Sequence, residues 1–307
     1  MRPIYLDTGT VAQASLRDKP RLAAVAGYGG LELWHHDVDP SSLSPVARSL
    51  LRERYGVELT QVDETATFDP HQLRSECTAR GLVIDGVIPP LDFAMRWHDD
   101  LGTEMHALIS AELPKYHALG VRYVVLPMLG EAGSLERTAE ILAELGELMR
   151  PFGILAAFEP IGHVRKASRA DEACRVIELS GRDANVGLVI DVFHFFQAQN
   201  TLRDLQSLPS ERIVTVHLND AMDLPLRELS GARHRVHPGE GIFDAVGFCR
   251  TLDAIGYRGP CAVEVLNEGY RRLDAAHVAR RSFEAAWSVL AAAEACLTTL
   301  PERAPSP

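Results

Sequence analysis

The sequence predicts a single-domain α/β protein with a (β/α)8 TIM barrel fold, and three observations lead to this prediction. Short apolar runs alternate with longer amphipathic stretches along the chain, as parallel strands alternate with helices. The chain has 307 residues, which suits one large barrel of typically about 250 residues or more. An open doubly wound sheet is the alternative, but no GxGxxG motif follows the first apolar run and no P-loop motif occurs.

The expected strands are short apolar runs, as strands covered on both faces should be. They are Ile4–Asp7, Gly30–Trp34, Leu82–Ile88, Tyr123–Met128, Ile154–Glu159, Val186–Asp191, Ile213–Leu218 and Ala262–Val265. We expect the barrel to occupy residues 1–296 and to carry its active site at the C-terminal ends of the strands. Residues 297–307 contain three prolines and are predicted to form a disordered tail.

Amphipathic segments lie between these runs. Ser134–Arg150 has apolar residues at helical spacing, begins at a serine that can cap the helix, and ends before Pro151. Ser168–Ser180 opens with Ser-Arg-Ala-Asp, which resembles a capping box with Asp in place of Glu. Further segments expected outside the regular alternation are an inserted helix at Ser44–Tyr55, a short strand or loop at Val57–Val62, and an Ala-rich closing helix at Asp274–Leu297.

Charge and composition exclude several classes of partner. Lys and Arg number 31 and Asp and Glu number 42, so the net charge of −11 disfavours passive binding to nucleic acid or to an anionic membrane. We expect no transmembrane helix and no signal peptide, because apolar runs are short and Asp7 comes too early. The five cysteines are scattered without a CxxC motif. These features predict a cytoplasmic protein, and they leave homo-oligomerisation open.

The last four expected strands place charged residues where the active site of a barrel lies. The strands end at or near Glu159, Asp191, His217 and Glu264. Three carboxylates that converge in a barrel mouth would repel one another without a cation. Mixed oxygen and nitrogen ligands without a thiolate suit Mn²⁺, Mg²⁺, Co²⁺ or Zn²⁺. The pattern therefore predicts one divalent metal ion.

Each of these residues also has a purely structural interpretation. Asp191 could cap the helix that follows, Glu159 could be a loop carboxylate before a proline, and His217 could be a hydrogen-bonded core histidine. Glu264 is harder to explain in this way, because Val263 and Val265 flank it. The coincidence of all four residues at matched strand ends favours the metal site.

Four further residues are candidates for contact with a substrate. His194 follows Asp191 by three residues, and Arg235 lies in the loop after the seventh expected strand. Arg235 could clamp a substrate oxygen or form a surface salt bridge. Trp34 and His35 end the second expected strand, where they would shape the pocket.

The second half of the chain resembles the xylose-isomerase-like TIM-barrel superfamily. The resemblance is carried by GLVIDVFHF at residues 187–195, VHLNDA at 216–221, RVHPGEG at 235–241 and GYRGPCAVE at 256–264, and it is greatest to the inosose (2-keto-myo-inositol) isomerase branch. It implies that Glu159, Asp191, His217 and Glu264 bind one divalent metal ion. It also implies that Glu159 and Glu264 exchange a substrate proton through a cis-enediolate of a keto-sugar or keto-inositol.

By the same resemblance, His194 and Arg235 hold substrate oxygens. Three features depart from the inosose isomerase pattern, namely His237, the Trp-His-His sequence at 34–36 and the loop at 221–232. A lyase remains an alternative, because dehydratases of this superfamily eliminate a hydroxyl with the same metal ligands. A non-catalytic binding protein is disfavoured because both glutamates are present.

An endonuclease IV-like nuclease is a remote alternative, because those enzymes need additional metal-binding histidines. The third and fourth expected strands end in Val-Ile-Pro-Pro and Leu-Pro-Met, which contain no histidine. The loop sequence His-Arg-Val-His at 234–237 also differs from the Asp-x-His of the nucleases. The sequence thus favours a small polyol or keto-sugar as the partner of the site.

Overall fold

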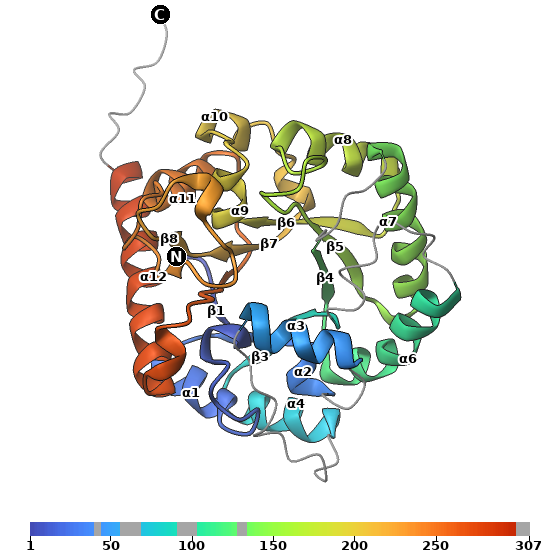
Figure 1. Cartoon of the computed structure of the whole chain (residues 1–307), viewed down its shortest axis with the longest axis horizontal. Coiled ribbons are helices and arrows are strands. Elements are labelled where there is room, and N and C mark those ends of the chain that lie inside the picture. Colours follow the sequence, from blue (N-terminus) through green and yellow to red (C-terminus); the bar gives the residue numbers. More distant parts are fainter. Residues whose placement is uncertain (40–43, 56–68, 91–102, 128–133, 299–307) are drawn as a thin grey trace, which may run out of the picture.

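A closed barrel of eight parallel strands, surrounded by helices, forms the part of the chain that the computed structural model describes, residues 1–39, 44–55, 69–90, 103–127 and 134–298 (Figure 1). In order around the barrel, the strands are β1 (Ile4–Asp7), β10 (Cys261–Val263), β7 (Ile213–Leu218), β6 (Val186–Asp191), β5 (Leu155–Glu159), β4 (Tyr123–Pro127), β3 (Val83–Ile88) and β2 (Gly30–Trp34). The predicted barrel is therefore confirmed.

The last strand of the barrel is the one that differs most from its expected bounds. The sequence predicts a strand that includes Glu264, but β10 ends at Val263. The hydroxyl of Thr10 donates to the Val263 carbonyl and accepts from the Val265 N–H, both at 2.8 Å. These two side-chain hydrogen bonds replace strand pairing on either side of Glu264.

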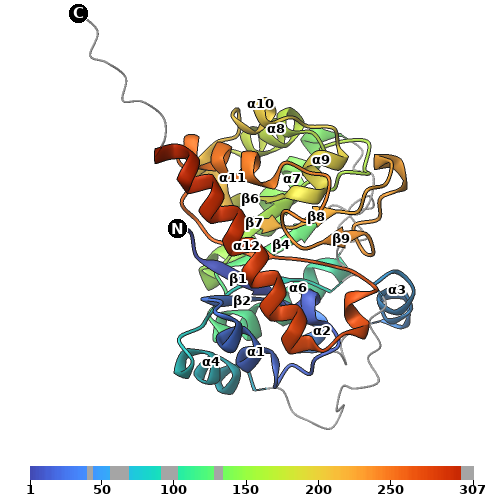
Figure 2. The same ribbon diagram turned by 90° about the vertical axis from the view of Figure 1, so that its left-hand side faces the viewer.

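Helices occupy the segments between the strands, on the outside of the barrel. The α-helices are α1 (Lys19–Ala26), α2 (His35–Val38), α3 (Pro45–Tyr55), α4 (Pro70–Ala79), α6 (Thr103–Leu119), α7 (Leu135–Met149), α8 (Ala170–Ser180), α9 (Val192–Gln197), α10 (Leu202–Leu205), α11 (Ala245–Ala254) and α12 (Ala275–Thr298). Short 3-10 helices are η1 (Thr8–Val11), η4 (Arg150–Phe152), η5 (Ser210–Arg212), η6 (Leu226–Glu228) and η7 (Tyr270–Arg272). Figure 2 shows α12 running along the outside of the barrel, where it packs against α1, α11 and β1.

The two predicted helix caps have different outcomes. Ser134 caps α7 as expected, since its hydroxyl accepts from the Arg137 N–H at 3.1 Å. The cap at Ser168 is wrong, because α8 begins only at Ala170. The side chain of Asn200 accepts from the Ala170 N–H at 3.0 Å, so a residue distant in sequence supplies the cap. Local sequence could not reveal that partner.

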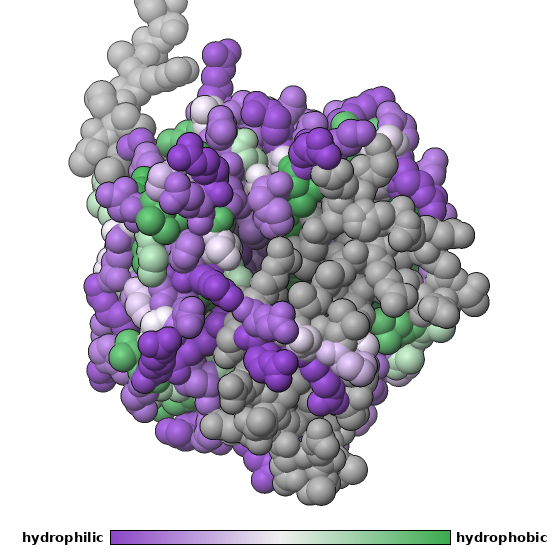
Figure 3. Space-filling model, viewed as in Figure 1, coloured by the Kyte–Doolittle hydropathy of each residue, from purple (hydrophilic) through white to green (hydrophobic). Residues whose placement is uncertain are grey.

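Two predicted segments lie wholly or mostly outside the described residues. These are the strand or loop at Val57–Val62 and the tail from residue 297, of which only 297 and 298 are described, as the end of α12. Within the described part, no helix has both the length and the apolar character that a membrane span requires. The described surface in Figure 3 is mainly hydrophilic, with hydrophobic residues in small groups.

Inside the barrel, Tyr123 packs in a small apolar cluster and carries a polar hydroxyl group. Tyr123, Val125, Ala157 and Val189 belong to this cluster. The ring of Tyr123 passes so close to Gly86 on β3 that a Cβ atom there would come within 2.8 Å of the Tyr123 hydroxyl oxygen, and closer still to ring carbons. Glycine is therefore required at this position for the tyrosine to lie across the barrel.

The loop after β7 folds back over the barrel mouth. Its strands β8 (Asp220–Ala221) and β9 (Arg235–Val236) pair in antiparallel orientation. The side-chain amide of Asn267 donates to the Arg235 carbonyl at 2.7 Å. This hairpin brings Arg235 back to the C-terminal ends of the barrel strands.

Candidate active site

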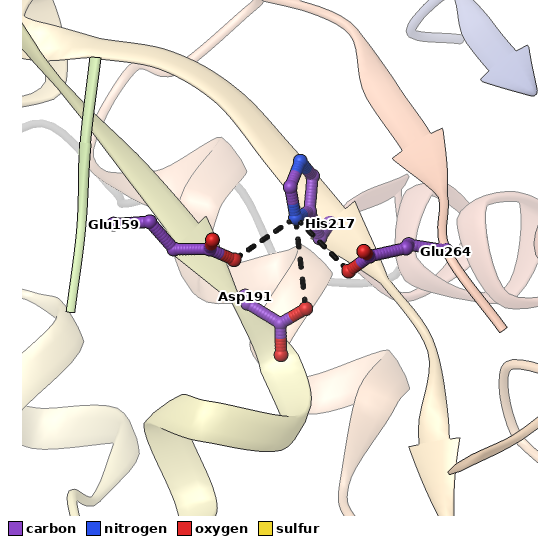
Figure 4. Close-up of side chains that lie close together, drawn as sticks. All are labelled: Glu159, Asp191, His217 and Glu264. Carbon is purple, nitrogen blue, oxygen red and sulfur yellow. Dashed lines mark hydrogen bonds and ion pairs between the residues drawn. The ribbon is translucent and has the colours of Figure 1, made fainter. Parts of the chain in front are cut away.

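The four predicted metal ligands meet at the C-terminal ends of β5, β6 and β7 and just beyond β10 (Figure 4). The Nδ1 atom of His217 lies 3.1 Å from Glu159 Oε1, 3.2 Å from Glu264 Oε2 and 3.7 Å from Asp191 Oδ2. One ligand atom from each residue lies within 4.8 Å of all the others, and all four side chains are buried. The structure thus brings together every residue of the predicted set.

Asp191 caps the helix that follows it and also faces the cluster. Its Oδ1 accepts from the His194 N–H at 2.9 Å and so caps α9. Its Oδ2 accepts from the Asn219 side-chain amide at 2.9 Å and faces the cluster. In the barrel register Asp191 pairs with His217, so strand pairing itself sets these two residues side by side.

The donor set fits a divalent cation. Three carboxylates and one imidazole nitrogen converge in a buried site that contains no thiol. The guanidinium of Arg235 lies beside them, with Nη1 at 2.5 Å from Asp191 Oδ2 and 2.7 Å from Glu264 Oε2. One arginine does not balance three carboxylates, and buried carboxylates are costly without matching positive charge. The mixture of oxygen and nitrogen ligands suits Mn²⁺, Mg²⁺, Co²⁺ or Zn²⁺.

The two glutamates of the cluster differ in proton affinity. Burial raises the pKa of Glu159 to about 7, although His217 acts to lower it. Burial also acts to raise the pKa of Glu264, but Arg235 and His217 outweigh it and the pKa lies below its usual value. Environments that separate the pKa values of two carboxyls are typical of acid and base pairs in enzymes.

Neighbouring groups of opposite charge determine the direction of the pKa shifts of His217 and Asp191, the other two residues of the cluster. Burial opposes the charged form of His217, but Glu32, Glu264 and Glu159 outweigh it and raise the pKa of His217 well above its usual value. Burial also acts to raise the pKa of Asp191, yet Arg235 leads the interactions that lower it below the usual range. Attraction to neighbours of opposite charge therefore outweighs burial at both His217 and Asp191.

Arg235 is a buried member of the site and not a surface residue. Besides its two carboxylate contacts, its Nε donates to the Gly231 carbonyl at 2.7 Å. Its Nη2 lies 3.3 Å from Nε2 of His194, and its guanidinium lies 5.3 Å from the centre of the Phe193 ring. Burial lowers the pKa of His194 to about 4. Because arginine only donates, the neutral imidazole of His194 accepts at Nε2 and carries its hydrogen on Nδ1.

A cavity of about 240 Å³ opens beside the cluster. Its polar lining comes from Glu159, Glu264, His194, Arg235 and His163, and its apolar lining includes Trp34, Ile88, Pro127, Ile161, Leu229 and Leu266. The indole N–H of Trp34 donates to both carboxyl oxygens of Asp7 at 3.0 Å, which fixes the ring at the cavity wall. The lining of the cavity thus combines polar and apolar side chains.

His35 is not among the residues that line this cavity, so the structure does not support the prediction that it contacts substrate. Its Nδ1 lies 2.8 Å from the Tyr116 hydroxyl, and it is buried between the barrel and α6. The helix α2 starts at His35, directly after β2. The turn from strand to helix directs Trp34 toward the cavity and His35 away from it.

Glu32 is a residue of the site that sequence reasoning missed. It lies on β2, fully buried, with Oε1 at 2.7 Å from Nε2 of His217. Its other oxygen accepts from the Tyr123 hydroxyl at 2.7 Å. A signal was present, because Leu31 and Leu33 flank Glu32 much as valines flank Glu264.

Sequence comparison relates the chain to two groups of enzymes. It is 31% identical to an inosose isomerase of Bacillus velezensis over 179 residues, which are 56% of this chain and 63% of that protein. It is 29% identical to a 3-dehydroshikimate dehydratase of Pseudomonas aeruginosa over 261 residues, which are 84% of this chain and 37% of that protein. The chain thus spans less than two thirds of the length of either relative.

Structural comparison confirms the architecture. The IOLI protein with a bound zinc atom matches with a TM-score of 0.76 and 21% identity, over 95% of this chain and 98% of that one. L-ribulose 3-epimerase matches with a TM-score of 0.70 and 17% identity, over 99% and 100% of the two chains. At these identities the likeness concerns the fold alone.

The family assignment rests on most of the chain. The sequence model of the xylose isomerase-like TIM barrel family matches residues 20–287. This range includes the four clustered residues, the loop that carries Arg235, and all the barrel strands except β1. The protein therefore belongs to the xylose isomerase-like TIM barrel family.

Proposed function

We propose that this chain is a metal-dependent isomerase or epimerase of a keto-sugar or keto-inositol such as an inosose. The observation that carries the proposal is the placement of Glu159 and Glu264, which approach the cluster from opposite sides of His217 (Figure 4). Both line the cavity beside the cluster. Two carboxyls placed in this way can remove a proton from one carbon of a substrate and return it elsewhere.

The residues of the chain would divide the work as follows. A divalent cation held by Glu159, Asp191, His217 and Glu264 would supply a Lewis acid for the carbonyl and hydroxyl oxygens of the substrate. One glutamate accepts the proton from the carbon next to the ketone, which leaves an enediolate. The other glutamate returns a proton to the neighbouring carbon or to the opposite face. No atom is lost, so the product is an isomer or an epimer.

The remaining lining would orient a polyhydroxylated ketone. Arg235 and His194 line the cavity and would contact the hydroxyl oxygens of a bound substrate. Trp34 presents an apolar face that suits the C–H surface of a sugar or inositol ring. The sequence similarity to inosose isomerases favours a keto-inositol among such substrates.

A lyase is the second candidate, because the dehydratase relative aligns over 84% of this chain. The same proton removal would be followed by departure of a hydroxyl from the β carbon as water, so that a double bond remains. The two candidates share the cluster and differ in the fate of the intermediate.

Proton exchange with D₂O, followed by NMR, tests the proposal. The chain would be stripped with EDTA and reloaded with Mn²⁺, Mg²⁺, Co²⁺ or Zn²⁺, with inososes, ketohexoses, hydroxypyruvate and 3-dehydroshikimate as substrates. We expect metal-dependent deuterium uptake that is lost in E264Q and kept in E112Q, a change at a buried glutamate on α6 that lies outside the cavity lining.

The outcomes separate the candidates. Uptake with conservation of all atoms supports the isomerase, and loss of water during exchange assigns the lyase. Metal binding without exchange in any of these substrates would refute the proposed substrate class. Failure of the wild-type chain to bind any of the metals would refute the proposed metal centre.

A further inference from the structure

We propose that Glu32 is a positioning residue, which holds the His217 imidazole in the one tautomer and orientation that directs a free Nδ1 lone pair into the carboxylate cluster. The inference rests on the proposed metal centre and extends it to a residue outside the ligand set. Glu32 lies on β2, and in the barrel order β1 and β10 separate β2 from β7, which carries His217.

The first argument is that two buried polar atoms have only each other. Glu32 and His217 are both fully buried. Glu32 Oε1 and His217 Nε2 lie 2.7 Å apart as an ion-pair contact, and neither atom has a hydrogen-bond partner in the described residues. A buried polar atom without a partner costs about 1–3 kcal/mol, so this contact determines how both groups are satisfied.

The second argument concerns the two nitrogens of the ring. Nδ1 of His217 faces Glu159, Asp191 and Glu264, whereas Nε2 faces Glu32 on the other side. A neutral imidazole carries one hydrogen, and it can ligate a cation only through the nitrogen that lacks it. A carboxylate can only accept a hydrogen bond, and Glu159 faces Nδ1 at 3.1 Å just as Glu32 faces Nε2, so the ring without a cation can carry hydrogen on both nitrogens. A cation held by the carboxylates would take the place of the hydrogen on Nδ1, and Glu32 would then keep the remaining hydrogen on Nε2.

The third argument is that Glu32 is itself fixed by a network. Its Oε2 accepts from the Tyr123 hydroxyl at 2.7 Å, and the Tyr123 ring fits only because Gly86 has no side chain. Gly86, Tyr123, Glu32 and His217 come from β3, β4, β2 and β7, so the network spans the barrel interior. A carboxylate whose Oε2 is held by Tyr123 can present its Oε1 to a histidine ring in one orientation.

Metal affinity of the E32Q variant is the decisive measurement, because glutamine keeps the shape of the side chain but not its charge. The dissociation constants of Zn²⁺ and Co²⁺ would be measured by competition with a chromophoric chelator. We expect E32Q to bind about 10- to 100-fold more weakly than the wild-type chain. The matched control is E112Q, in which a buried glutamate paired with Lys115 on α6 is changed, and its affinity should stay within about twofold of wild type.

A second readout needs no variant of Glu32. In the Zn²⁺-loaded wild-type chain, ¹⁵N-histidine NMR, assigned with H217Q, should show zinc on Nδ1 of His217 and hydrogen on Nε2. Hydrogen on Nδ1 would overturn the proposal even if E32Q failed to fold. E32Q that is folded by circular dichroism and binds both metals as tightly as wild type would also overturn it.

The test is separable from that of the proposed function. A wild-type chain that binds no metal would overturn both proposals. A chain that binds metal through the expected tautomer, and loses affinity in E32Q, supports the role of Glu32 even if no substrate in the exchange experiment reacts.

Discussion

Substitution of Gly86 by alanine is expected to damage the metal site from a distance. Gly86 touches none of the four clustered residues, but the added Cβ would lie 2.8 Å from the Tyr123 hydroxyl oxygen and nearer to two ring carbons. Ordinary contacts between such atoms need about 3.5 Å or more. The tyrosine must therefore shift, and Glu32 loses the hydroxyl that holds one of its oxygens.

The expected magnitude follows from these distances. The hydroxyl oxygen alone needs a retreat of about 0.7 Å, the difference between about 3.5 Å and 2.8 Å, and the nearer ring carbons need more. The 2.7 Å hydrogen bond from Tyr123 to Glu32 would therefore stretch to at least about 3.4 Å, at or beyond the limit for such bonds. Overpacking a core costs about 1–3 kcal/mol, and an unsatisfied buried hydroxyl costs about 1–3 kcal/mol more. Alanine regains only about 0.5–1 kcal/mol through its lower chain entropy.

Urea unfolding and metal competition would measure the two consequences. We expect G86A to lose about 1–5 kcal/mol of its free energy of unfolding and to bind Zn²⁺ several-fold more weakly. G29A is the control, because a Cβ at Gly29 meets its nearest neighbour at an ordinary 3.7 Å. If G86A matched the wild-type chain in both stability and metal affinity, the claim that Tyr123 positions Glu32 would be refuted.

Three further predictions concern burial, pH and metal. In urea unfolding, K19M should lose about 3–5 kcal/mol of its free energy of unfolding, because fully buried Lys19 pairs with Asp37 at 2.6 Å. The control R21M, at an exposed site, should change the free energy of unfolding by less than about 0.5 kcal/mol. Equal effects of the two substitutions would contradict the prediction. In the folded protein, burial lowers the pKa of His36 to about 4, whereas a histidine in the unfolded chain has a pKa of about 6.5. On acidification the unfolded chain therefore binds a proton at this residue at a higher pH than the folded protein does. The free energy of unfolding should then fall by about 3 kcal/mol from this residue as the pH drops from about 6.5 to 4, and H36Q should flatten that slope; an unchanged slope would contradict it. Removal of metal with EDTA should lower the melting temperature measured by scanning calorimetry. A metal ion present at 1,000 times its dissociation constant stabilises the folded state by about 4 kcal/mol. An unchanged melting temperature would contradict the proposal that the purified protein holds a metal ion.

Much of the fold and the cluster of Glu159, Asp191, His217 and Glu264 could be predicted from sequence, because both depend on local patterns. Strands such as Gly30–Trp34 and Val186–Asp191 have the predicted bounds, since continuous apolar runs ending in a charged or aromatic residue mark buried parallel strands. The four ligands follow from the rule that barrel active sites lie at strand ends. That rule needs no knowledge of which strands are neighbours.

The errors have a common physical origin in partners that are distant along the chain. Ser168 failed as a cap because Asn200 takes that role, and Glu32 was overlooked because its partner His217 lies across the barrel. His35 was placed in the pocket because the sequence does not show on which side the chain turns after Trp34. A carboxylate between two leucines, as at Glu32, carries the same signal that identified Glu264.

The hydroxyl of Thr10, which bonds the backbone on both sides of Glu264, has a consequence for biosynthesis. Glu159, Asp191 and His217 emerge from the ribosome well before Glu264, and the strand that places Glu264 pairs with β1, the first strand to be made. A nascent chain that ends before β10 holds three of the four ligands but has an open barrel. At the proposed metal centre, capture of a cation by all four residues would therefore be a late event that reports closure of the barrel, and metal retention would serve as a simple test of completed folding.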